Sequence, residues 1–439
     1  MSLSNGNGKS SGETGVSVSK FGVLCRALAV NFLVASSITV GVPFAFGQSQ
    51  TPTPAGAVGA PDKKAAPAGQ SEEAPAASAQ VGQKEDDDKK KDDADKKDDA
   101  KKKGEKRGSL VIAPIPISSP AFGSGLILIV GYVFKFDQKD EVSPPSWAGA
   151  EGVYTGNGTR GLAVASRLYL KENKYQTTFA VASGRANLDF YGVGRIPGRP
   201  AVAVPLSMGG KIFFGEVLRN VGRDFFIGPR YQFRRLTANI DGVRPEGGFD
   251  VPAIDIKSNS AALGFHLQRD RRNSTFYPTK GTLLDFTADF FDQAWGSRRE
   301  YQVYKIAYNG FHEVAPRQVL AYRAMACTAN GSVPFYDLCL YGFNSDVRGY
   351  TTGQFQNRRM FAAQAEYRLD WRKRLGFTAF GGFGGVARGW NDLRMDGLLP
   401  GAGVGLRFKL DKKNHINYRI DFAFGREGRT LAIGVGEAF

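Results

Sequence analysis

The sequence predicts an all-β protein, a single transmembrane antiparallel β-barrel of about sixteen strands preceded by a signal peptide and a disordered tether. Three observations predict this fold. The 439 residues include 32 Phe, 16 Tyr and 55 Gly, which is a high share of aromatic residues and glycine. Apolar and polar residues alternate over many segments, which is the period of a strand with two unlike faces. After residue 108 no stretch is apolar enough to be a membrane-spanning helix.

Residues 1–47 are expected to form the signal peptide. Lys20 and Arg26 supply positive charge, the run 27–46 is largely apolar, and small residues precede Gln48 at the positions that a signal peptidase reads. The alternative is a retained membrane anchor, because about 20 residues can span a bilayer. Polar residues within the run favour cleavage, and with either outcome the rest of the chain leaves the cytoplasm.

Residues 48–107 form the predicted tether. The segment is first rich in Ala, Pro, Gly and Ser, and from Lys84 to Arg107 it alternates short blocks of Lys and Asp. Neither part has enough apolar surface to offset the entropy cost of folding. We interpret it as a solvated spacer, with contact to peptidoglycan or a periplasmic partner as the alternative. Residues 108–439 are the barrel domain.

The alternation identifies the strands of the barrel. Apolar side chains occupy every second position of 361–369, 402–410 and 416–424. Aromatic residues lie near the strand ends, where interfacial girdles form. Because only a closed sheet satisfies its backbone in lipid, an exported, aromatic, strand-only chain is expected in the bacterial outer membrane.

Short and long connections alternate along the domain, as they do at the periplasmic and extracellular ends of a barrel. A short turn is expected at 411–414 and the longest loop at 330–357. About fifteen strands are clear, and two periplasmic ends require an even number. The sixteenth is expected at Ser109–Ser118, where Pro114 and Pro116 confine the strand to a sheet edge.

Two motifs give the domain a family resemblance. The longest loop contains Val347-Arg348-Gly349-Tyr350, and an earlier turn contains Asp270, Arg272, Asn273, Pro278 and Gly281. They are similar to the Val-Arg-Gly-Phe/Tyr loop and the Asp-x-Arg-Asn…Pro-x-x-Gly turn of the bacterial surface antigen family. From about residue 110 onward the chain resembles those sixteen-stranded barrels. The resemblance implies a relationship to the BamA and TamA insertases and to two-partner secretion pores.

The sequence departs from that family in two places. Insertases of the family carry periplasmic POTRA domains before the barrel, whereas here the predicted tether stands in that place. The family often has an aspartate where this chain has Gly382, so one usual partner of the loop arginine is missing.

Arg348 needs an acidic partner if the long loop folds into the lumen, because a guanidinium is always charged. The alternation places Glu366 and Asp421 on the lumen face, with Asp370 nearer to the periplasmic turn. The loop can then be a latch that plugs the barrel, or a switch whose release opens a path. The third interpretation is a surface-loop arginine that binds only water.

The only cysteines of the expected mature chain are Cys327 and Cys339, at the outer end of a strand and within the next loop. In an oxidising periplasm we expect them to pair as a disulfide, with free buried thiols as the alternative.

The C-terminus carries a candidate assembly signal. Gly434 and Phe439 fit the small-and-aromatic spacing that the barrel-assembly machinery recognises, although Glu437 stands where a second aromatic is usual. We expect Phe439 to end the last strand.

No enzyme activity, cofactor or metal site is predicted. His266, His312 and His415 are scattered over separate segments and support neither a zinc site nor a catalytic triad. Export excludes nucleic acid. The expected partners are outer-membrane lipid and lipopolysaccharide, the barrel-assembly machinery during biogenesis, and a protein or lipid substrate.

Three functions fit these features. The resemblance favours assisted insertion or translocation of protein or lipid substrates, with a weak seam between the first and last strands and the long loop as plug. A passive diffusion channel with slight anion preference fits the excess of 42 basic over 28 acidic residues after Arg107 and the predicted lumenal residues Arg368, Arg407, Lys409 and Arg419. The third function is a structural surface barrel without transport.

Overall fold

A computed structural model of the chain describes residues 48–49, 108–119, 123–137, 139–191, 193–195, 197–198, 204–240, 254–342, 346–351 and 353–439. The predicted signal peptide lies outside these ranges, as does the predicted tether apart from its first two residues. By its contacts the chain divides into two units, and the barrel belongs to the one that contains residues 108–439.

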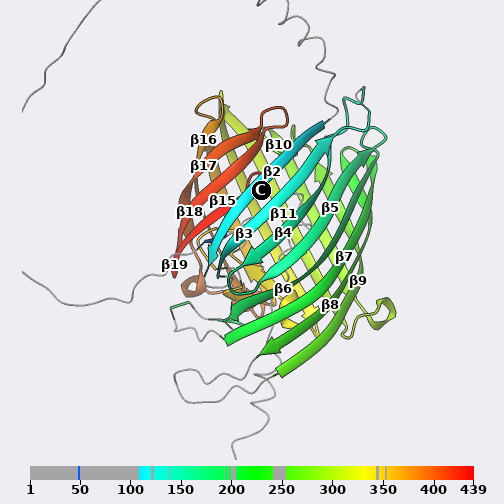
Figure 1. The fold of residues 1–439 in the computed structure, drawn as a ribbon, viewed down its shortest axis with the longest axis vertical. Helices are drawn as coiled ribbons and strands as arrows, with labels where there is room; N and C mark the ends of the chain where they lie inside the picture. Colours follow the sequence, from blue (N-terminus) through cyan, green and yellow to red (C-terminus); the bar gives the residue numbers. More distant parts are fainter. Residues whose placement is uncertain are drawn as a thin grey trace, which may run out of the picture. The chain divides into compact units, whose positions relative to one another are not determined.

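Sixteen antiparallel strands form a nearly closed barrel, which confirms the predicted fold class and strand number (Figure 1). They are β2 Gly108–Ser119, β3 Gly123–Phe134, β4 Ser146–Thr155, β5 Arg160–Leu170, β6 Tyr175–Phe190, β7 Val204–Gly222, β8 Phe225–Ile240, β9 Ile254–Asp270, β10 Gly281–Phe291, β11 Tyr301–Ala315, β12 Gln318–Gly331, β15 Arg359–Leu369, β16 Leu375–Ala387, β17 Gly401–Asp411, β18 Ile416–Gly425 and β19 Gly428–Val435.

The remaining elements are short. They are β1 Gln48–Ser49, β13 Cys339–Tyr341, β14 Phe355–Asn357, and the 3₁₀ turns η1 Gln293–Trp295, η2 Phe335–Asp337, η3 Trp390–Asp392 and η4 Met395–Gly397. Strands β13 and β14 pair with each other inside the long loop between β12 and β15. Within the described ranges, no helix has the length and apolar character to span a membrane.

The barrel is polar inside and apolar outside. In β15 the side chains of Gln364, Glu366 and Arg368 are buried, whereas Ala365 and Tyr367 between them are exposed. A soluble protein would bury the apolar face, so this inversion identifies a lipid-facing outer surface. The lumen face of β15 is therefore lined by buried polar and charged side chains.

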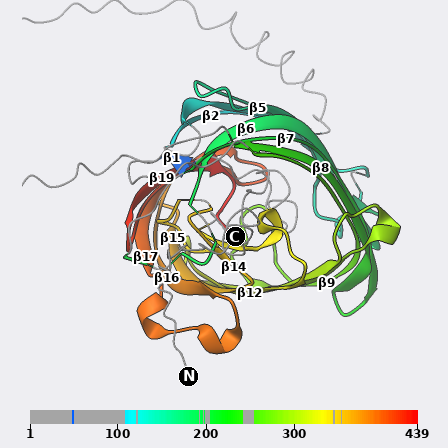
Figure 2. The same ribbon diagram turned by 90° about the horizontal axis from the view of Figure 1, so that it is seen from below.

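The two ends of the sheet meet without a defined register. Every neighbouring pair from β2 round to β19 has one, but none joins β19 to β2 within the described residues. The first predicted strand, Ser109–Ser118, is β2, and within the described residues it has a register only with β3, as its prolines indicated for an edge strand. In Figure 2 the sheet ends meet where the labels β1, β2 and β19 lie together.

Aliphatic contacts join these ends instead. Val111 and Ile115 of β2 belong to one buried cluster with Ile433 and Val435 of β19. Val435 lies opposite Tyr418 on β18, on the face away from the lumen, so the inward face of β2 covers the outward face of β19. We call this overlap the lap.

Strand β1 adds a contact that the sequence did not predict. Gln48 and Ser49, the first residues of the predicted tether, pair with Ala432 and Leu431 of β19. The free edge of β19 therefore carries a short partner from the other end of the chain.

The prediction that Phe439 ends the last strand is wrong. β19 ends at Val435, and Gly436 then adopts a φ of 85°, which turns the chain out of the sheet. Phe439 is buried in the lumen against Phe311, and its backbone oxygen accepts a hydrogen bond from Arg368 Nη2 at 3.0 Å. Figure 2 shows the C-terminal end inside the ring of strands. The assembly role of Gly434 and Phe439 stays a prediction.

Candidate functional site

The long loop brings Arg348 into the lumen. The side chain is 1% exposed, and its Nη2 lies 2.5 Å from Glu366 Oε2 while its Nη1 lies 2.7 Å from Asp421 Oδ2. Its Nε donates to Gln364 Oε1 at 3.2 Å, and the guanidinium carbon lies 3.3 Å from the centre of the Phe380 ring. Arg348 thus contacts both predicted carboxylates, from β15 and β18, and is not a water-bound surface residue.

Local backbone geometry places the arginine there. The Asp346 side chain accepts hydrogen bonds from the backbone N–H groups of Gly342 and Val347, which closes a turn just before Arg348. Gly349 has a φ of 115°, and a Cβ there would lie 2.7 Å from the carbonyl carbon of Phe424. Only glycine satisfies both the left-handed backbone and this close approach. We call residues 346–351 the arm.

Tyr350 fixes the outer end of the arm. Its hydroxyl donates to Pro400 O at 2.5 Å and accepts from Arg426 N at 3.1 Å. Its ring packs edge to face against Tyr341, with centroids 5.3 Å apart. Burial raises the pKa of Tyr350 to about 12, so the hydroxyl remains a neutral hydrogen-bond donor at physiological pH.

Arg348 belongs to a larger ion network. Arg368 Nε lies 2.7 Å from Glu366, and Arg407 contacts Asp421 at 2.6 Å and Glu437 at 2.8 Å. Each carboxylate is therefore shared between arginines. We call the following residues the lumenal network: Arg348, Arg368, Arg407, Arg419, Glu366, Asp421 and Glu437.

Gly382 does not leave a gap in this network. A Cβ at this position would lie 2.4 Å from the carbonyl oxygen of Ala363, so an aspartate could not enter without a backbone shift. Asp421 and Glu366 supply the carboxylate contacts to Arg348 instead.

The opposite end of the loop has its own anchor, which sequence reasoning missed. Asp337 of η2 lies 2.6 Å from Arg234 Nη1 on β8 and accepts a hydrogen bond from the Tyr301 hydroxyl. The Tyr336 hydroxyl lies 2.8 Å from Ser258 Oγ on β9. The run Phe335-Tyr336-Asp337-Leu338, unusually apolar for an outer loop, was the available signal. The loop therefore crosses the lumen from the β8–β9 wall to the β15–β18 wall.

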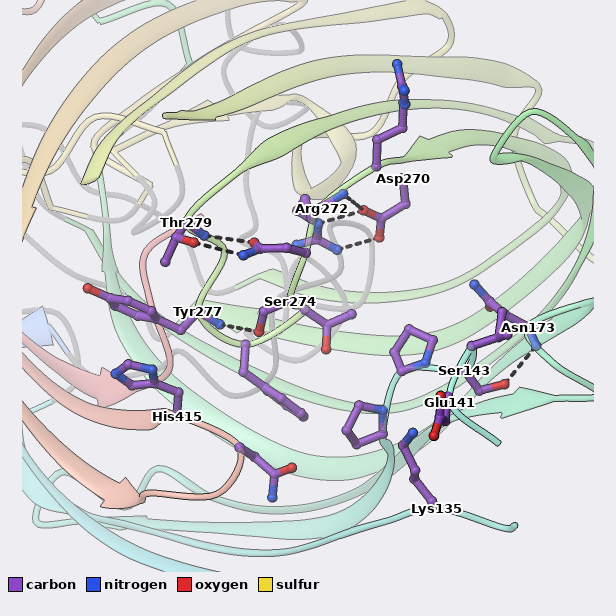
Figure 3. A pocket seen from close by; sticks show the side chains of 18 of the residues that line it. Lys135, Glu141, Ser143, Asn173, Asp270, Arg272, Ser274, Tyr277, Thr279 and His415 are labelled. Carbon is purple, nitrogen blue, oxygen red and sulfur yellow. Dashed lines mark hydrogen bonds and ion pairs between the residues drawn. The ribbon is translucent and has the colours of Figure 1, made fainter. Parts of the chain in front are cut away.

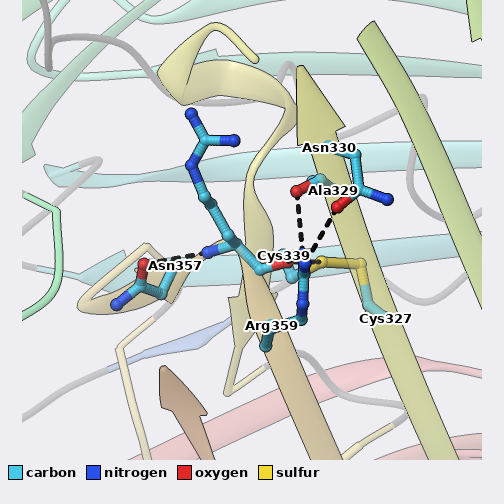
Figure 4. Close-up of a disulfide and its surroundings, with 7 residues drawn as sticks. Cys327, Ala329, Asn330, Cys339, Asn357 and Arg359 are labelled. Carbon is cyan, nitrogen blue, oxygen red and sulfur yellow. Dashed lines mark hydrogen bonds between the residues drawn. A yellow bond between two sulfur atoms is a disulfide. The ribbon is translucent and has the colours of Figure 1, made fainter. Parts of the chain in front are cut away.

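A disulfide joins the root of this loop to the barrel wall. Cys327 on β12 and Cys339 on β13 are bonded, both are buried, and their Cα atoms lie 5.7 Å apart (Figure 4). Beside them Arg359 Nη1 donates to the carbonyl oxygen of Ala329 at 2.9 Å. Asp337 lies within the segment that the disulfide closes, whereas the arm lies beyond it.

His266 has a structural explanation. Its Nδ1 lies 2.9 Å from Glu216 Oε2 and its Nε2 lies 2.9 Å from Asp285 Oδ2. Each ring nitrogen therefore faces a carboxylate oxygen at hydrogen-bond distance, an arrangement that suits a doubly protonated ring. The described part of the chain contains no group of three or more His, Cys, Asp or Glu residues arranged to hold a metal ion.

The second motif builds the turn between β9 and β10. Asp270 holds Arg272 through two hydrogen bonds of 2.9 and 2.7 Å. The Asn273 side chain bonds to Thr279 and to the backbone N–H of Lys280, which closes the turn. The motif residues thus shape a rigid turn rather than a chemical site.

This turn lines a cavity of about 770 Å³ at the barrel end opposite to the long loop (Figure 3). Tyr277 stacks on His415 of the β17–β18 turn, with ring centroids 4.2 Å apart, and Phe276 joins the buried cluster of the lap. Burial raises the pKa of Tyr277. The β9–β10 turn therefore packs against the meeting sheet ends.

The Omp85 superfamily domain matches residues 160–439 of the chain. The chain belongs to the Omp85 superfamily. This confirms the predicted relationship, and an Omp85 barrel lies in the bacterial outer membrane. No match was found among curated protein sequences.

Similar solved structures include three barrels. BamA from Haemophilus ducreyi lacking POTRA domains 1–3 has 13% identity over 75% of this chain and 69% of its own, with a TM-score of 0.47. CdiB from Acinetobacter baumannii has 14% identity over 75% and 59%, with 0.46. CdiB from Escherichia coli has 11% identity over 75% and 62%, with 0.49. The chain thus spans less than two thirds of either CdiB chain.

Proposed function

We propose that this Omp85 barrel assists the insertion or translocation of protein or lipid substrates at the outer membrane, with the arm as a releasable plug. The observation that carries the proposal is the position of Arg348, which is buried between Glu366 and Asp421 on the lumen wall. An extracellular loop pinned this deeply obstructs the lumen. We call the contacts of Arg348 with these two carboxylates the latch. The activity needs no chemical catalysis.

The surrounding charges favour a reversible latch. After release of Arg348, Glu366 keeps its contact with Arg368, and Asp421 keeps its contact with Arg407. Neither of these two carboxylates is then left unpaired, and an unpaired buried charge is the usual large cost of breaking a buried ion pair. The released guanidinium regains water at the loop surface.

The lap supports a route from the lumen into the membrane. Within the described residues the sheet ends share no ladder register, and β2 and β19 contribute aliphatic side chains to one buried cluster. Separating apolar surfaces inside a bilayer costs less than in water, because lipid tails replace the lost contacts. In this proposal the arm controls access to the lumen, and separation of β2 from β19 at the lap opens a path from the lumen into the membrane.

A depletion experiment tests the proposed function. Cells depleted of the protein should lose a defined subset of outer-membrane proteins or lipids, and the wild-type chain should restore that subset. Arg348→Ala should restore it incompletely. Arg394→Ala is the matched control, because Arg394 is an outer-loop arginine whose side chain is 80% exposed. An unchanged census after depletion would refute the proposal.

The second candidate is the anion-preferring diffusion channel, which the lumenal arginines favour. Arg368, Arg407 and Arg419 are all buried on the lumen side. Planar-bilayer recording separates the two functions. Steady anion-selective conductance of the wild-type barrel, without an effect of depletion on other membrane components, would favour the channel.

A further inference from the structure

Arg419 is the one member of the lumenal network without a hydrogen-bond partner in the described part of the chain. Its side chain is 0% exposed, and its Nε, Nη1 and Nη2 all lack an acceptor. The nearest carboxylate oxygen, Asp421 Oδ2, lies 3.7 Å from Nε. A buried guanidinium with five unsatisfied N–H groups requires an acceptor that the described side chains do not supply.

Asp421 cannot fill that role as it stands. Its Oδ2 accepts from Arg348 Nη1 at 2.7 Å, and its Oδ1 accepts from Arg407 Nη1 at 2.6 Å. Both oxygens are engaged by stronger, shorter contacts than the one to Arg419. The acceptor must therefore come from outside the network.

The neighbours of Arg419 define its surroundings. On β17 the residue directly opposite is Arg407, and on β19 it is Gly434, which contributes no side chain. Arg407 Nη2 also lacks a hydrogen-bond acceptor, and its nearest carboxylate oxygen, on Glu366, is 3.7 Å away. Two like charges directly opposite each other across strands repel.

Water could accept hydrogen bonds from these groups, but it carries no charge to offset the repulsion. A small anion does both. We propose that a small monovalent inorganic anion, chloride under physiological conditions, binds on the lumen wall between Arg419 and Arg407.

The bound anion regulates the latch. With the anion in place, Arg419 is satisfied and Asp421 remains available to Arg348. Without it, Arg419 competes for Asp421, whose Oδ2 is the nearest carboxylate oxygen at 3.7 Å, and the latch weakens. This consequence for the arm rests on the proposed function, whereas the anion site itself does not.

Bromide locates the site directly. Crystals of the full-length chain grown in sodium bromide should show an anomalous peak beside Arg419 and Arg407, and Arg419→Met should remove it. Arg372→Met is the matched control, because Arg372 is an exposed arginine of the β15–β16 turn and should keep the peak.

Solution stability tests whether the anion binds at physiological concentration. At matched ionic strength, replacing gluconate by chloride at ten times its dissociation constant should raise the folded-to-unfolded ratio about tenfold, since a ligand that binds only the folded state stabilises it by mass action. Arg419→Met should abolish this difference, and Arg372→Met should retain it. The wild-type comparison alone is decisive if Arg419→Met fails to assemble.

The outcomes distinguish the two proposals. No bromide peak, or a peak with equal wild-type stability in chloride and gluconate, would overturn the anion site. If both measurements confirm the site but chloride does not change protease access to the arm, the proposed regulation of the latch is refuted. An unchanged depletion census would refute only the proposed function.

Discussion

The arm and the lap are both joints between distant parts of the chain, but they are held by different forces. Arg348 makes directional contacts with Glu366, Asp421 and Gln364, all buried in the lumen. The lap is held by aliphatic side chains such as Ile115 and Ile433, without a ladder register. A directional joint is either made or broken, whereas an aliphatic joint can slide. The barrel therefore has one joint held by specific ionic contacts, the latch, and one held by apolar packing that tolerates displacement, the lap.

The largest expected effect comes from breaking the directional joint. Replacing Arg348 with Ala removes its charge-assisted hydrogen bonds to Glu366 and Asp421, worth about 1.5–3 kcal/mol each, while both carboxylates keep their contacts with Arg368 and Arg407. We expect the arm to become sensitive to protease and the conductance to rise, while the barrel stays folded. Limited proteolysis and bilayer recording measure both effects. Equal protease sensitivity of wild type and Arg348→Ala would show that Arg348 does not hold the arm in place.

Charge-reversal variants identify which carboxylate holds Arg348. Arg348→Glu should loosen the arm more than Arg348→Ala does, because it faces two carboxylates. Adding Asp421→Arg or Glu366→Arg should restore protection for whichever carboxylate carries more of the latch. If neither double variant regains protection, the network holds the arm collectively rather than through one pair.

Loosening the aliphatic joint is expected to have the next largest effect. Ile115 of β2 is 0% exposed in the lap, and Ile115→Ala should destabilise the seam by about 2–4 kcal/mol. Ile112 on the same strand is 54% exposed on the lipid side, so Ile112→Ala is the matched control. Heat modifiability on gels should fall only for Ile115→Ala. A similar fall for both variants would mean that β2 is held by general lipid contact.

The disulfide should have a smaller effect, confined to the root of the loop. Replacing Cys327 and Cys339 by Ser removes a constraint worth about 2–3 kcal/mol for a short closed loop. Protease should then reach the segment around η2 before it reaches the arm, because Arg348 keeps its own contacts. Mass spectrometry of the fragments would order the cuts. Simultaneous cleavage at both places would show that the two anchors are not independent.

The smallest expected effect concerns acid. Burial alone would raise the pKa of Asp370, but hydrogen bonds from His415 and Lys409 outweigh it and hold the pKa below its ordinary value. A lowered folded-state pKa adds stability that is present above the unfolded value, near pH 4, and is lost as pH falls through the folded value. Asp370→Asn should remove this acid dependence between turns β15–β16 and β17–β18. The same pH profile of unfolding in wild type and Asp370→Asn would contradict this prediction.

The positions of most strands could be predicted from the local sequence pattern, whereas the contacts that form the latch and the lap could not. Alternation in Arg359–Leu369 predicted β15 and the lumenal side of Glu366, and the prolines of Ser109–Ser118 predicted an edge strand. The small-and-aromatic spacing of Gly434 and Phe439 predicted that the final strand would reach Phe439. It could not reveal that Gly436 adopts a left-handed conformation, because glycine is compatible with either backbone.

The contacts of Arg348 show where prediction from sequence stops. The residues pointed to Glu366 or Asp421, but only the folded barrel brings β15 and β18 close enough for one guanidinium to reach both. The apolar run around Asp337 marked this part of the loop, but the sequence did not identify Arg234 as the partner of Asp337, because each is an ordinary charged residue in its own segment. A weak seam between the first and last strands was predicted, but the sequence did not show that the buried face of β2 covers the outward face of β19.

The inward turn after Val435 has a practical consequence for protein handling. Phe439 packs against Phe311 and is hydrogen-bonded to Arg368, so the chain terminus occupies space inside the barrel. An affinity tag or reporter fused after Phe439 must either thread through the lumen or pull the last residues out of it. Such fusions would change the part of the molecule that they are meant to report on, and an epitope inserted in the exposed 3₁₀ segment Met395–Gly397 would avoid the problem.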